Sequence, residues 1–247
     1  MKTYGNIRRY IHTFILILFG INVSMAQNNC NITPAPKTNY PQYIVSGMLI
    51  SYGIYSLFDK TRQVDHKIRD FSITKLNGIR NRSDDFTQYI PALSVYALNA
   101  FDIKGKHSWQ NATIIYAGSM AFVGALVLPT KYTAKRLRPD NSSRNSFPSG
   151  HTATAFASAE FLRREYSDVS PLIGIAGYAI ATYTGAMRIA NNRHWLSDVV
   201  TGAGIGILST TLSYCIYENV MEPRGWNFSV TPVIDNNSLG ISYTMVF

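Results

Sequence analysis

Charged residues are scarce in this sequence, and cysteine is nearly absent. Asp, Glu, Lys and Arg make up 15% of the 247 residues, whereas about 25% is usual for soluble domains. The two cysteines, Cys30 and Cys215, lie far apart, and neither their number nor their spacing supports a metal site. No run of Pro, Gly, Ser or like charge is long enough to be a linker. The composition therefore predicts one main domain with apolar segments.

The net charge of +9 raises the question of nucleic acid. The Lys and Arg residues do not form a single stripe, and no nucleic-acid-binding module is recognisable. A basic chain with apolar segments more often meets phosphate-bearing lipids or substrates. We therefore expect a membrane and a phosphorylated lipid as partners, and no nucleic acid.

Residues 1–26 have the pattern of an export signal. Three basic residues among the first nine precede the apolar stretch 14–23, and residues 24–26 resemble a small-x-small cleavage site. We expect a mature chain that starts near Gln27. An uncleaved first membrane helix is the alternative, although the apolar stretch is short for a span.

Uncharged stretches recur along the rest of the chain. Most are about 16 to 23 residues long, near the roughly 20 needed to cross a bilayer as a helix, and they contain Gly and Ala as membrane helix contacts do. The stretches are 40–58, 86–101, 108–130, 151–159, 169–187 and 199–217. This pattern predicts an all-α, membrane-associated bundle of six helices. The alternative is a soluble all-α domain whose core helices lack charge.

Two other segments have their own patterns. Apolar residues from Val64 to Leu76 are spaced like one face of a helix, which fits an interfacial amphipathic helix or a surface helix packed on the bundle. After Glu218, apolar and polar residues alternate around a turn-prone stretch at 235–240, which predicts a terminal β-hairpin. We accordingly divide the chain into a signal at 1–26, a main domain at 27–222 and a hairpin appendage at 223–247.

Two blocks of the sequence place cationic and polar groups at the ends of apolar helices. Lys131 is followed after six residues by Arg138 and Pro139, a pattern that alone is typical of a solvated membrane flank. In the second block, Ser149 is a natural N-cap, and Gly150 lets the backbone come close to an anion. Free N–H groups and the helix dipole are then expected to converge on a phosphate oxygen.

The third block combines Arg188, His194 and Asp198. If His194 and Asp198 share a helix face, the carboxylate can bond one imidazole nitrogen and fix the tautomer. The other nitrogen is then available as a nucleophile. A single His–Asp pair at this spacing is more often structural, so the three blocks carry the prediction together.

In order and spacing, the three blocks match the signature of the type 2 phosphatidic acid phosphatase superfamily, which also includes bacterial acid phosphatases and vanadium haloperoxidases. The sequence resembles this family from Lys131 to Asp198, and the helical pattern extends the likeness over about 40–217. The matching positions are Lys131, Arg138, Pro139, Pro148, Ser149, Gly150, His151, Arg188, His194 and Asp198. One position departs, because the family usually has Ser where this chain has Met187.

The resemblance implies a role for each matching residue. His194 would attack phosphorus, Asp198 would orient it, and His151 would protonate the leaving oxygen and then activate water. The phosphoryl oxygens would be bound by Lys131, Arg138, Ser149, Gly150 and Arg188, without a metal or other cofactor. We assign the neighbouring Lys135, Arg136 and Arg193 to the surface or to a second phosphate.

Three functions remain open at this point. The leading one is an envelope phosphatase that cleaves a phosphomonoester or pyrophosphate of lipid A, undecaprenyl pyrophosphate or a glycerolipid phosphate, with its active site facing the periplasm of a Gram-negative cell. The alternatives are a soluble exported acid phosphatase or vanadate haloperoxidase, and a non-catalytic membrane module that binds phosphorylated lipid. The periplasmic assignment assumes that the stretch 40–58 lies shallowly or packs without crossing.

Overall fold

The computed structural model describes residues 40–57, 62–76, 81–222, 227–235 and 238–246. The predicted export signal at 1–26 and Cys30 lie outside these residues. The elements are α2 (Tyr40–Ser56), α3 (Arg62–Leu76), α4 (Ser83–Thr87), α5 (Ile90–Ala100), α6 (Trp109–Ala134), α7 (Gly150–Tyr166), α8 (Pro171–Ala190), α9 (Leu196–Ile216), the π-helix η2 (Tyr217–Met221), β1 (Asn227–Asp235) and β2 (Ser238–Val246).

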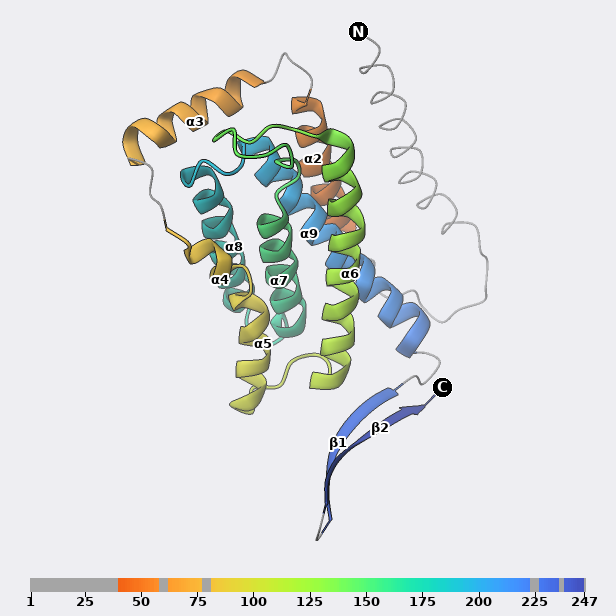
Figure 1. Ribbon diagram of the computed structural model, residues 1–247. Coiled ribbons are helices and arrows are strands. Elements are labelled where there is room, and N and C mark those ends of the chain that lie inside the picture. Colours follow the sequence, from red (N-terminus) through yellow and green to blue (C-terminus); the bar gives the residue numbers. More distant parts are fainter. Residues whose placement is uncertain (1–39, 58–61, 77–80, 223–226, 236–237, 247) are drawn as a thin grey trace. The chain divides into compact units, whose positions relative to one another are not determined.

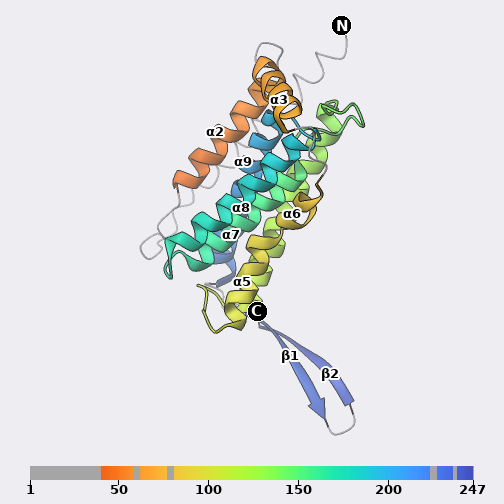
Figure 2. The ribbon, with the colours of Figure 1, turned by 90° about the vertical axis from the view of Figure 1, so that its left-hand side faces the viewer.

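The long helices form a bundle around α7 (Figures 1 and 2). α7 packs against α8, α9, α5 and α6, and α2 lies along α9. α7 and α9 approach closely at two glycines: a side-chain carbon added at Gly202 would lie 2.5 Å from the carbonyl oxygen of Ser149, and one at Gly206 would lie 2.3 Å from that of Ala153. Each predicted stretch is helical over most of its described residues, although a turn at 88–89 divides the stretch 86–101 between α4 and α5, so the all-α character of the bundle is confirmed.

α7 is longer than its sequence pattern indicates. The uncharged stretch ends at Ala159, but the helix continues to Tyr166 because its charged residues are buried in pairs. Glu160 accepts hydrogen bonds from Arg163 and Arg164 at 2.7–2.8 Å. Glu165 is bound by Nδ1 of His107 at 2.8 Å and by the Tyr214 hydroxyl at 2.5 Å. Buried carboxylates with such partners do not interrupt a helix core.

α2 is a full member of the bundle. Gly53, near its C-terminal end, lies against Thr201 and Ser197 at the start of α9, and Ser46 lies against Gly204 further along. α2 therefore runs antiparallel to α9 along the bundle. These small residues allow a lengthwise contact with α9, and the expectation that 40–58 lies shallowly or packs without crossing a membrane stays a prediction.

Two helices of the described chain are long and apolar enough to cross a membrane: α6, and α9 continued through η2 to Met221. Length and composition alone are weak support for a span. The outer surface of the bundle adds to it, since large apolar side chains on several helices are more than half exposed. They include Met48, Leu93, Leu128, Leu172 and Ile175. These features favour membrane association.

α3 turns its polar residues toward the bundle. Asp65 and Ser72 are buried at 2% and 3% exposure, whereas Val64, Ile68 and Phe71 are 44%, 37% and 61% exposed. The helix lies across the end of the bundle where α2, α8 and α9 meet (Figure 1). α3 therefore packs on the bundle as a surface helix and presents an apolar stripe outward, and its place at a membrane interface stays a prediction.

β1 and β2 pair antiparallel, with Asn227 opposite Val246 and Asp235 opposite Ser238. They occupy the part of the chain in which the sequence predicts a terminal hairpin.

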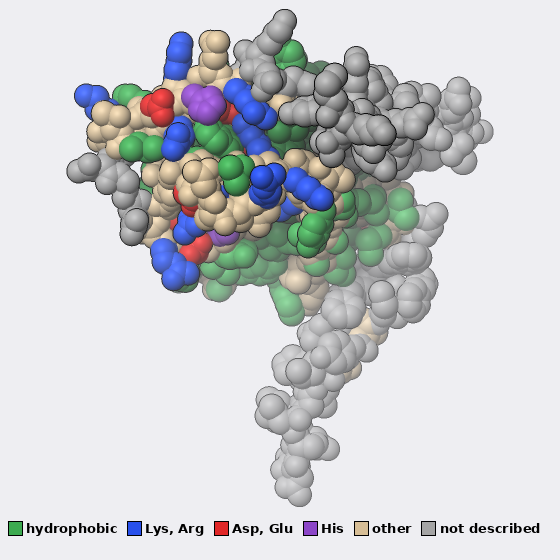
Figure 3. Space-filling view, turned by 45° about the horizontal axis from the view of Figure 1, so that its top comes forward, with side chains coloured by type: hydrophobic (Ala, Val, Ile, Leu, Met, Phe, Trp, Pro, Cys, Tyr) green, Lys and Arg blue, Asp and Glu red, His purple; other side chains and the backbone are tan. Residues whose placement is uncertain are grey.

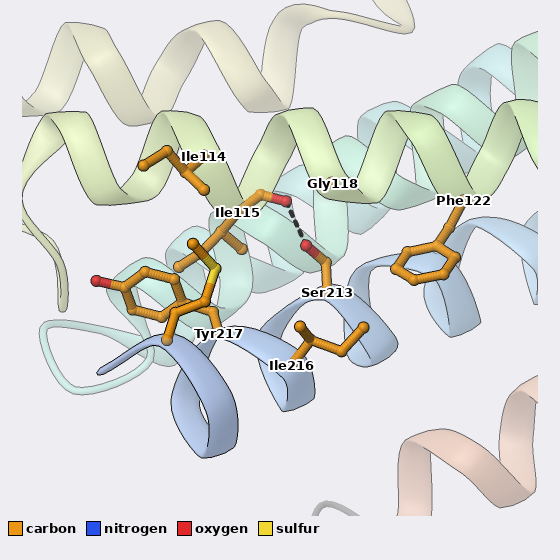
Figure 4. Close-up of a pocket in the computed structure, with 8 residues that line it drawn as sticks. Ile114, Ile115, Gly118, Phe122, Ser213, Ile216 and Tyr217 are labelled. Atoms are coloured by element: carbon orange, nitrogen blue, oxygen red, sulfur yellow. Dashed lines mark hydrogen bonds between the residues drawn. The ribbon is translucent and has the colours of Figure 1, made fainter. Parts of the chain in front are cut away.

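A small apolar pocket of about 120 Å³ lies between α6 and the end of α9 (Figure 4). It is lined by Ile114, Ile115, Gly118, Phe122, Ser213, Ile216, Tyr217 and Met221. The Ser213 hydroxyl donates to the carbonyl oxygen of Ile115 at 2.6 Å, so the polar group in this lining is satisfied. Gly118 and Lys131 are separated by about 20 Å along α6 at 1.5 Å per residue. The pocket is thus remote from the chemical groups described next.

Candidate active site

The predicted site residues come together at one end of the bundle. Lys131 lies in the last turn of α6, His151 in the first turn of α7, Arg188 in the last turn of α8 and Asp198 in the first turn of α9. His194 lies in the short loop between α8 and α9. Viewed from this end, Lys and Arg side chains gather among Asp and His side chains, with apolar side chains around them (Figure 3).

His194 and Asp198 face each other, although not along a helix. His194 precedes α9, and Asp198 is the third residue of that helix. The Asp198 carboxylate reaches back to accept from the backbone N–H of Trp195 at 2.9 Å, which is a capping contact. Its Oδ2 lies 3.5 Å from Nδ1 of His194, and Nδ1 has no hydrogen-bond partner within the described part of the chain. Nε2 is the nitrogen that remains for a substrate.

Burial keeps the His194 imidazole neutral. The side chain is 2% exposed, and burial lowers the pKa of His194 to about 4, against the attraction of Asp198. The positive charges of Arg188 and Lys131 act in the same direction as burial. At neutral pH the ring is therefore unprotonated, which is the state that a nitrogen nucleophile requires.

Arg136 holds Asp198 in place, so its assignment to the surface is wrong. Its guanidinium donates to Oδ1 of Asp198 at 2.7 Å and to Oδ2 of Asp65 in α3 at 2.6 Å. It also donates to the hydroxyl of Ser197 at 2.6 Å and lies over the Trp195 ring at 5.5 Å. Residue spacing gave no sign of this contact, because Asp65 comes from a distant segment. By contrast, Lys135 is exposed and Arg193 pairs with Asp140 at an exposed position.

Asp198 has two further partners. The Ser146 hydroxyl donates to the carboxylate oxygen Oδ2, and the backbone N–H of Ser149 donates to the backbone carbonyl oxygen of Asp198 at 3.0 Å. Arg136, Ser146 and the N–H of Trp195 together fix the carboxylate. Ser146 is a site residue that the sequence motif does not include.

Three cationic side chains, Lys131, Arg138 and Arg188, lie close enough to repel one another, and Lys131 and Arg188 also act on His194. Lys131 donates to the carbonyl oxygens of Asn145 and Pro148, both at 2.7 Å, and a third N–H is left over. Burial and the charge of Arg188 lower the pKa of Arg138. Nε of Arg138 and Nε of Arg188 are buried without a hydrogen-bond partner in the described residues. Buried donors of this kind require a partner, and an anion with several oxygens supplies it.

Ser149 and Gly150 begin α7 at the same place. The Ser149 hydroxyl is fully buried and caps the helix, accepting from the Thr152 N–H at 3.4 Å and contacting the Thr152 hydroxyl at 2.8 Å. The N-cap prediction is confirmed. Because the hydroxyl is committed to this cap, the free N–H groups of the first helical turn are the stronger candidates for an oxyanion contact.

α4 contributes two carboxylates that the sequence analysis missed. Asp84 is fully buried, accepts from Nη1 of Arg188 and receives a hydrogen bond from Asn191 at 3.1 Å. Asp85 lies 3.0 Å from Nε2 of His151. The only signal in the sequence is an Asp-Asp pair before an uncharged stretch, and no spacing connects it with the other blocks.

A neutral histidine beside a buried carboxylate, with three cationic side chains nearby at one end of a helical bundle, is an arrangement suited to binding and transferring a phosphoryl group. The PAP2 superfamily profile matches residues 112–222, and the chain belongs to this superfamily of phosphoester hydrolases.

Two known proteins illustrate the relationship. The chain is 41% identical over 173 residues to a lipid A 1-phosphatase of Porphyromonas gingivalis. The aligned region covers 69% of this chain and 39% of that protein. The chain thus spans about two fifths of the length of this relative. The fold is similar to that of a transmembrane PAP2-type phosphatidylglycerolphosphate phosphatase from Bacillus subtilis, with a TM-score of 0.51 and 21% identity over 73% of this chain and 98% of the other.

Proposed function

We propose that this protein is a phosphatase of envelope lipids that uses His194 as its nucleophile, with lipid A as the first candidate substrate. The observation that carries the proposal is the neutral, buried His194 beside Asp198, with unpaired guanidinium nitrogens of Arg138 and Arg188. Binding alone needs cations but neither a neutral nucleophile nor an acid. The arrangement therefore favours catalysis over a non-catalytic lipid-binding module.

The proposed reaction has two halves. In the first, the Nε2 lone pair of His194 forms a bond to phosphorus as the P–O bond to the lipid breaks, and the leaving oxygen takes a proton from His151. In the second, water gives a proton to His151 as its oxygen attacks phosphorus, the P–N bond breaks, and inorganic phosphate leaves. Lys131, Arg138 and Arg188 stabilise the charge on the phosphoryl oxygens in both halves.

Two observations support a lipid substrate. The relative from Porphyromonas gingivalis is a lipid A 1-phosphatase, and 69% of this chain aligns with it. The site lies at the end of a bundle whose outer helices expose large apolar side chains, and the adjacent α3 presents the apolar Val64, Ile68 and Phe71 outward. A phosphate at a lipid headgroup would meet the cations at this level, while its acyl chains stay with the apolar helix surfaces.

Phosphate release from a panel of purified lipids tests the substrate. Lipid A, undecaprenyl pyrophosphate and phosphatidic acid are presented to the purified protein in mixed micelles, with His194→Ala as the inactive control. We expect the highest kcat/KM with lipid A. Release from a small water-soluble phosphomonoester alone would instead favour the acid phosphatase, and bromide oxidation in the presence of vanadate would favour the haloperoxidase.

We further propose that the site faces the periplasm. Cysteine labelling tests this in cells with a permeabilised outer membrane, in a Cys30→Ser/Cys215→Ser background. Arg144 is exposed in the loop between α6 and α7, and Ser167 is exposed in the loop at the opposite end of α7. A membrane-impermeant thiol reagent should label Arg144→Cys and spare Ser167→Cys. The reverse pattern would put the site in the cytoplasm.

The same experiment bears on the export signal. α2 ends at the site end of the bundle, because Gly53 lies against Thr201 in the first turns of α9. If α2 crosses the membrane beside α9, a periplasmic site requires the chain to enter α2 from the cytoplasm. A cleaved signal that exports the residues after 26 would then be excluded. Labelling of Arg144→Cys from outside would therefore leave two arrangements: a cleaved signal with an α2 that does not cross, or a crossing α2 that the chain enters from the cytoplasm.

A further inference from the structure

Asp85 is the only carboxylate in the described chain that contacts the ring of His151. Its Oδ1 lies 3.0 Å from Nε2 of that ring, and its Oδ2 accepts from Nε of Arg82 at 3.1 Å. The backbone carbonyl of Asp85 accepts from the Gln88 side chain at 2.8 Å. The carboxylate is therefore held by one contact on each oxygen, and the helix that carries it, α4, packs on α7 and α8.

The contact commits one of the two ring nitrogens. An ionised carboxylate only accepts hydrogen bonds, so Nε2 of His151 is the donor and carries a proton. Although burial opposes it, hydrogen bonds from Arg82 and His151 hold the pKa of Asp85 below its usual value. No described residue makes a hydrogen bond with Nδ1 of His151, and the side chain is 33% exposed. Nδ1 is therefore the nitrogen that can face a leaving oxygen.

The surrounding charges act on His151 in opposite directions. The pKa of His151 lies below its usual value, because burial and the positive charge of Arg188 lower it by more than Asp85 and Asp84 raise it. A general acid must hold its proton until the leaving oxygen takes it. Burial and Arg188 favour loss of the proton from His151, and the negative charge of Asp85 opposes this loss.

We propose that Asp85 is the positioning residue of His151: it fixes the proton on Nε2, aims Nδ1 at the leaving oxygen and favours the doubly protonated ring. This inference rests on the proposed function. When the P–O bond breaks, the proton on Nδ1 passes to the leaving oxygen, and His151 becomes neutral with Nε2–H still bonded to Asp85. In the second half, Nδ1 takes a proton from the attacking water, which restores the starting state. The arrangement mirrors that of Asp198 behind His194.

Asp85 differs from the neighbouring Asp84 in a way that makes a test feasible. Asp84 is fully buried against Arg188, and its loss would leave a buried cation unpaired. The Asp85 side chain is one third exposed, so its contacts are only partly buried. Asn has nearly the same volume as Asp, so Asp85→Asn creates no cavity. The matched control is Asp102→Asn, an exposed carboxylate between α5 and α6 at the other end of the bundle.

The kinetic test compares kcat/KM for two phosphate esters that share one long alkyl tail, an alkyl phosphate and an aryl phosphate. Asp85→Asn should reduce hydrolysis of the alkyl ester by roughly 10- to 100-fold, part of the 10²- to 10⁴-fold that a positioned acid contributes. The aryl ester, whose leaving group needs little help from a proton, should lose far less. The alkaline limb of the pH profile should move down by about one pH unit. Equal losses for both esters, or an unmoved limb, would overturn the proposal.

A double-mutant cycle separates positioning from a structural effect. If Asp85 acts through His151, adding Asp85→Asn to His151→Ala should cause no further loss of alkyl ester hydrolysis. Multiplied losses would mean that Asp85 acts elsewhere. Asp102→Asn should leave both the rate and the pH profile at wild-type values.

A measurement without turnover keeps this inference distinct from the proposed function. The chain has 5 histidines, so ¹⁵N-histidine NMR in detergent can assign the His151 signals by their loss in His151→Ala. We expect the Nε2–H tautomer in the wild type and a mixture in Asp85→Asn. An unchanged tautomer would refute the role of Asp85 even in an active enzyme. A wild type that releases phosphate from no lipid would instead refute the proposed function.

Discussion

Replacement of Arg136 by Met tests whether this buried arginine supports Asp198. Arg136 neutralises two carboxylates, Asp65 at 2% and Asp198 at 0% exposure, through contacts of 2.6 and 2.7 Å. Methionine has a similar length, so the main loss is the charge and its donors. Removing one partner of a buried ion pair costs about 3–5 kcal/mol, because the other partner stays buried and unpaired. For a chain of this size that corresponds to a fall in Tm of roughly 10 °C.

The assay is thermal unfolding of the purified protein in detergent, followed by phosphate release well below the lower Tm. Lys135→Met is the matched control, because Lys135 is adjacent, exposed and equally charged. A surface substitution of this kind changes stability by less than about 0.5 kcal/mol. Arg136→Met should also reduce turnover more than Lys135→Met does, since Asp198 loses one of the groups that fix it.

A second substitution makes the reasoning about charge refutable. Asp65→Asn removes one of the two carboxylates that Arg136→Met leaves unpaired. The Ser197 N–H donates to Asp65 at 2.9 Å, and an Asn at this position can still accept that hydrogen bond. The double variant should therefore be more stable than Arg136→Met alone. Strictly additive losses, or a Tm for Arg136→Met equal to that of Lys135→Met, would show that the buried ion pairs do not carry the stability.

Further predictions concern the chemistry. His194→Ala should abolish turnover and Asp198→Asn should lower it strongly with the fold retained, as phosphate release and circular dichroism would report; near-normal activity of His194→Ala would refute the mechanism. EDTA should leave activity intact while vanadate inhibits competitively, because cationic side chains already surround the site; activity lost to EDTA and restored by a divalent metal would contradict this. Stability should fall as pH drops from 6.5 towards 4, since unfolded His194 takes up a proton there and folded His194, with a pKa of about 4, does not. The free energy of unfolding should fall by about 3 kcal/mol in total from this histidine. His194→Gln should not show this part of the fall when its Tm is measured across the same pH range.

The helices were predictable because their apolar stretches are long and bounded by charge. α6 and α8 match their stretches closely, and α9 begins three residues early because the capping contact of Asp198 with Trp195 sets its start. The end of α7 was not predictable from the pattern. Glu160 ends the uncharged stretch in the sequence, but in the fold it is buried and paired with Arg163 and Arg164, so the helix continues. A charge interrupts a buried helix only when it lacks a partner.

The position of the site was predictable, and the way its residues are held was not. His194, His151 and Arg188 lie in blocks with fixed spacing, and the fold brings these blocks together at one end of the bundle. The residues that support them follow another rule. Asp65, Asp84 and Asp85 come from α3 and α4, and only the packing of these helices on the bundle brings them to their partners.

The α3–α4 region therefore links an exposed apolar surface to the site. α3 exposes Phe71 and Ile68 on one side and uses Asp65 on the other to bind Arg136, which binds Asp198. Any displacement of α3 along the bundle would first stretch the contact between Asp65 and Arg136. Since Asp198 has independent contacts with Ser146 and the Trp195 N–H, its carboxylate would lose one hydrogen-bond partner and keep two. This redundancy explains why a loss of stability, more than a complete loss of turnover, is the expected consequence of weakening α3.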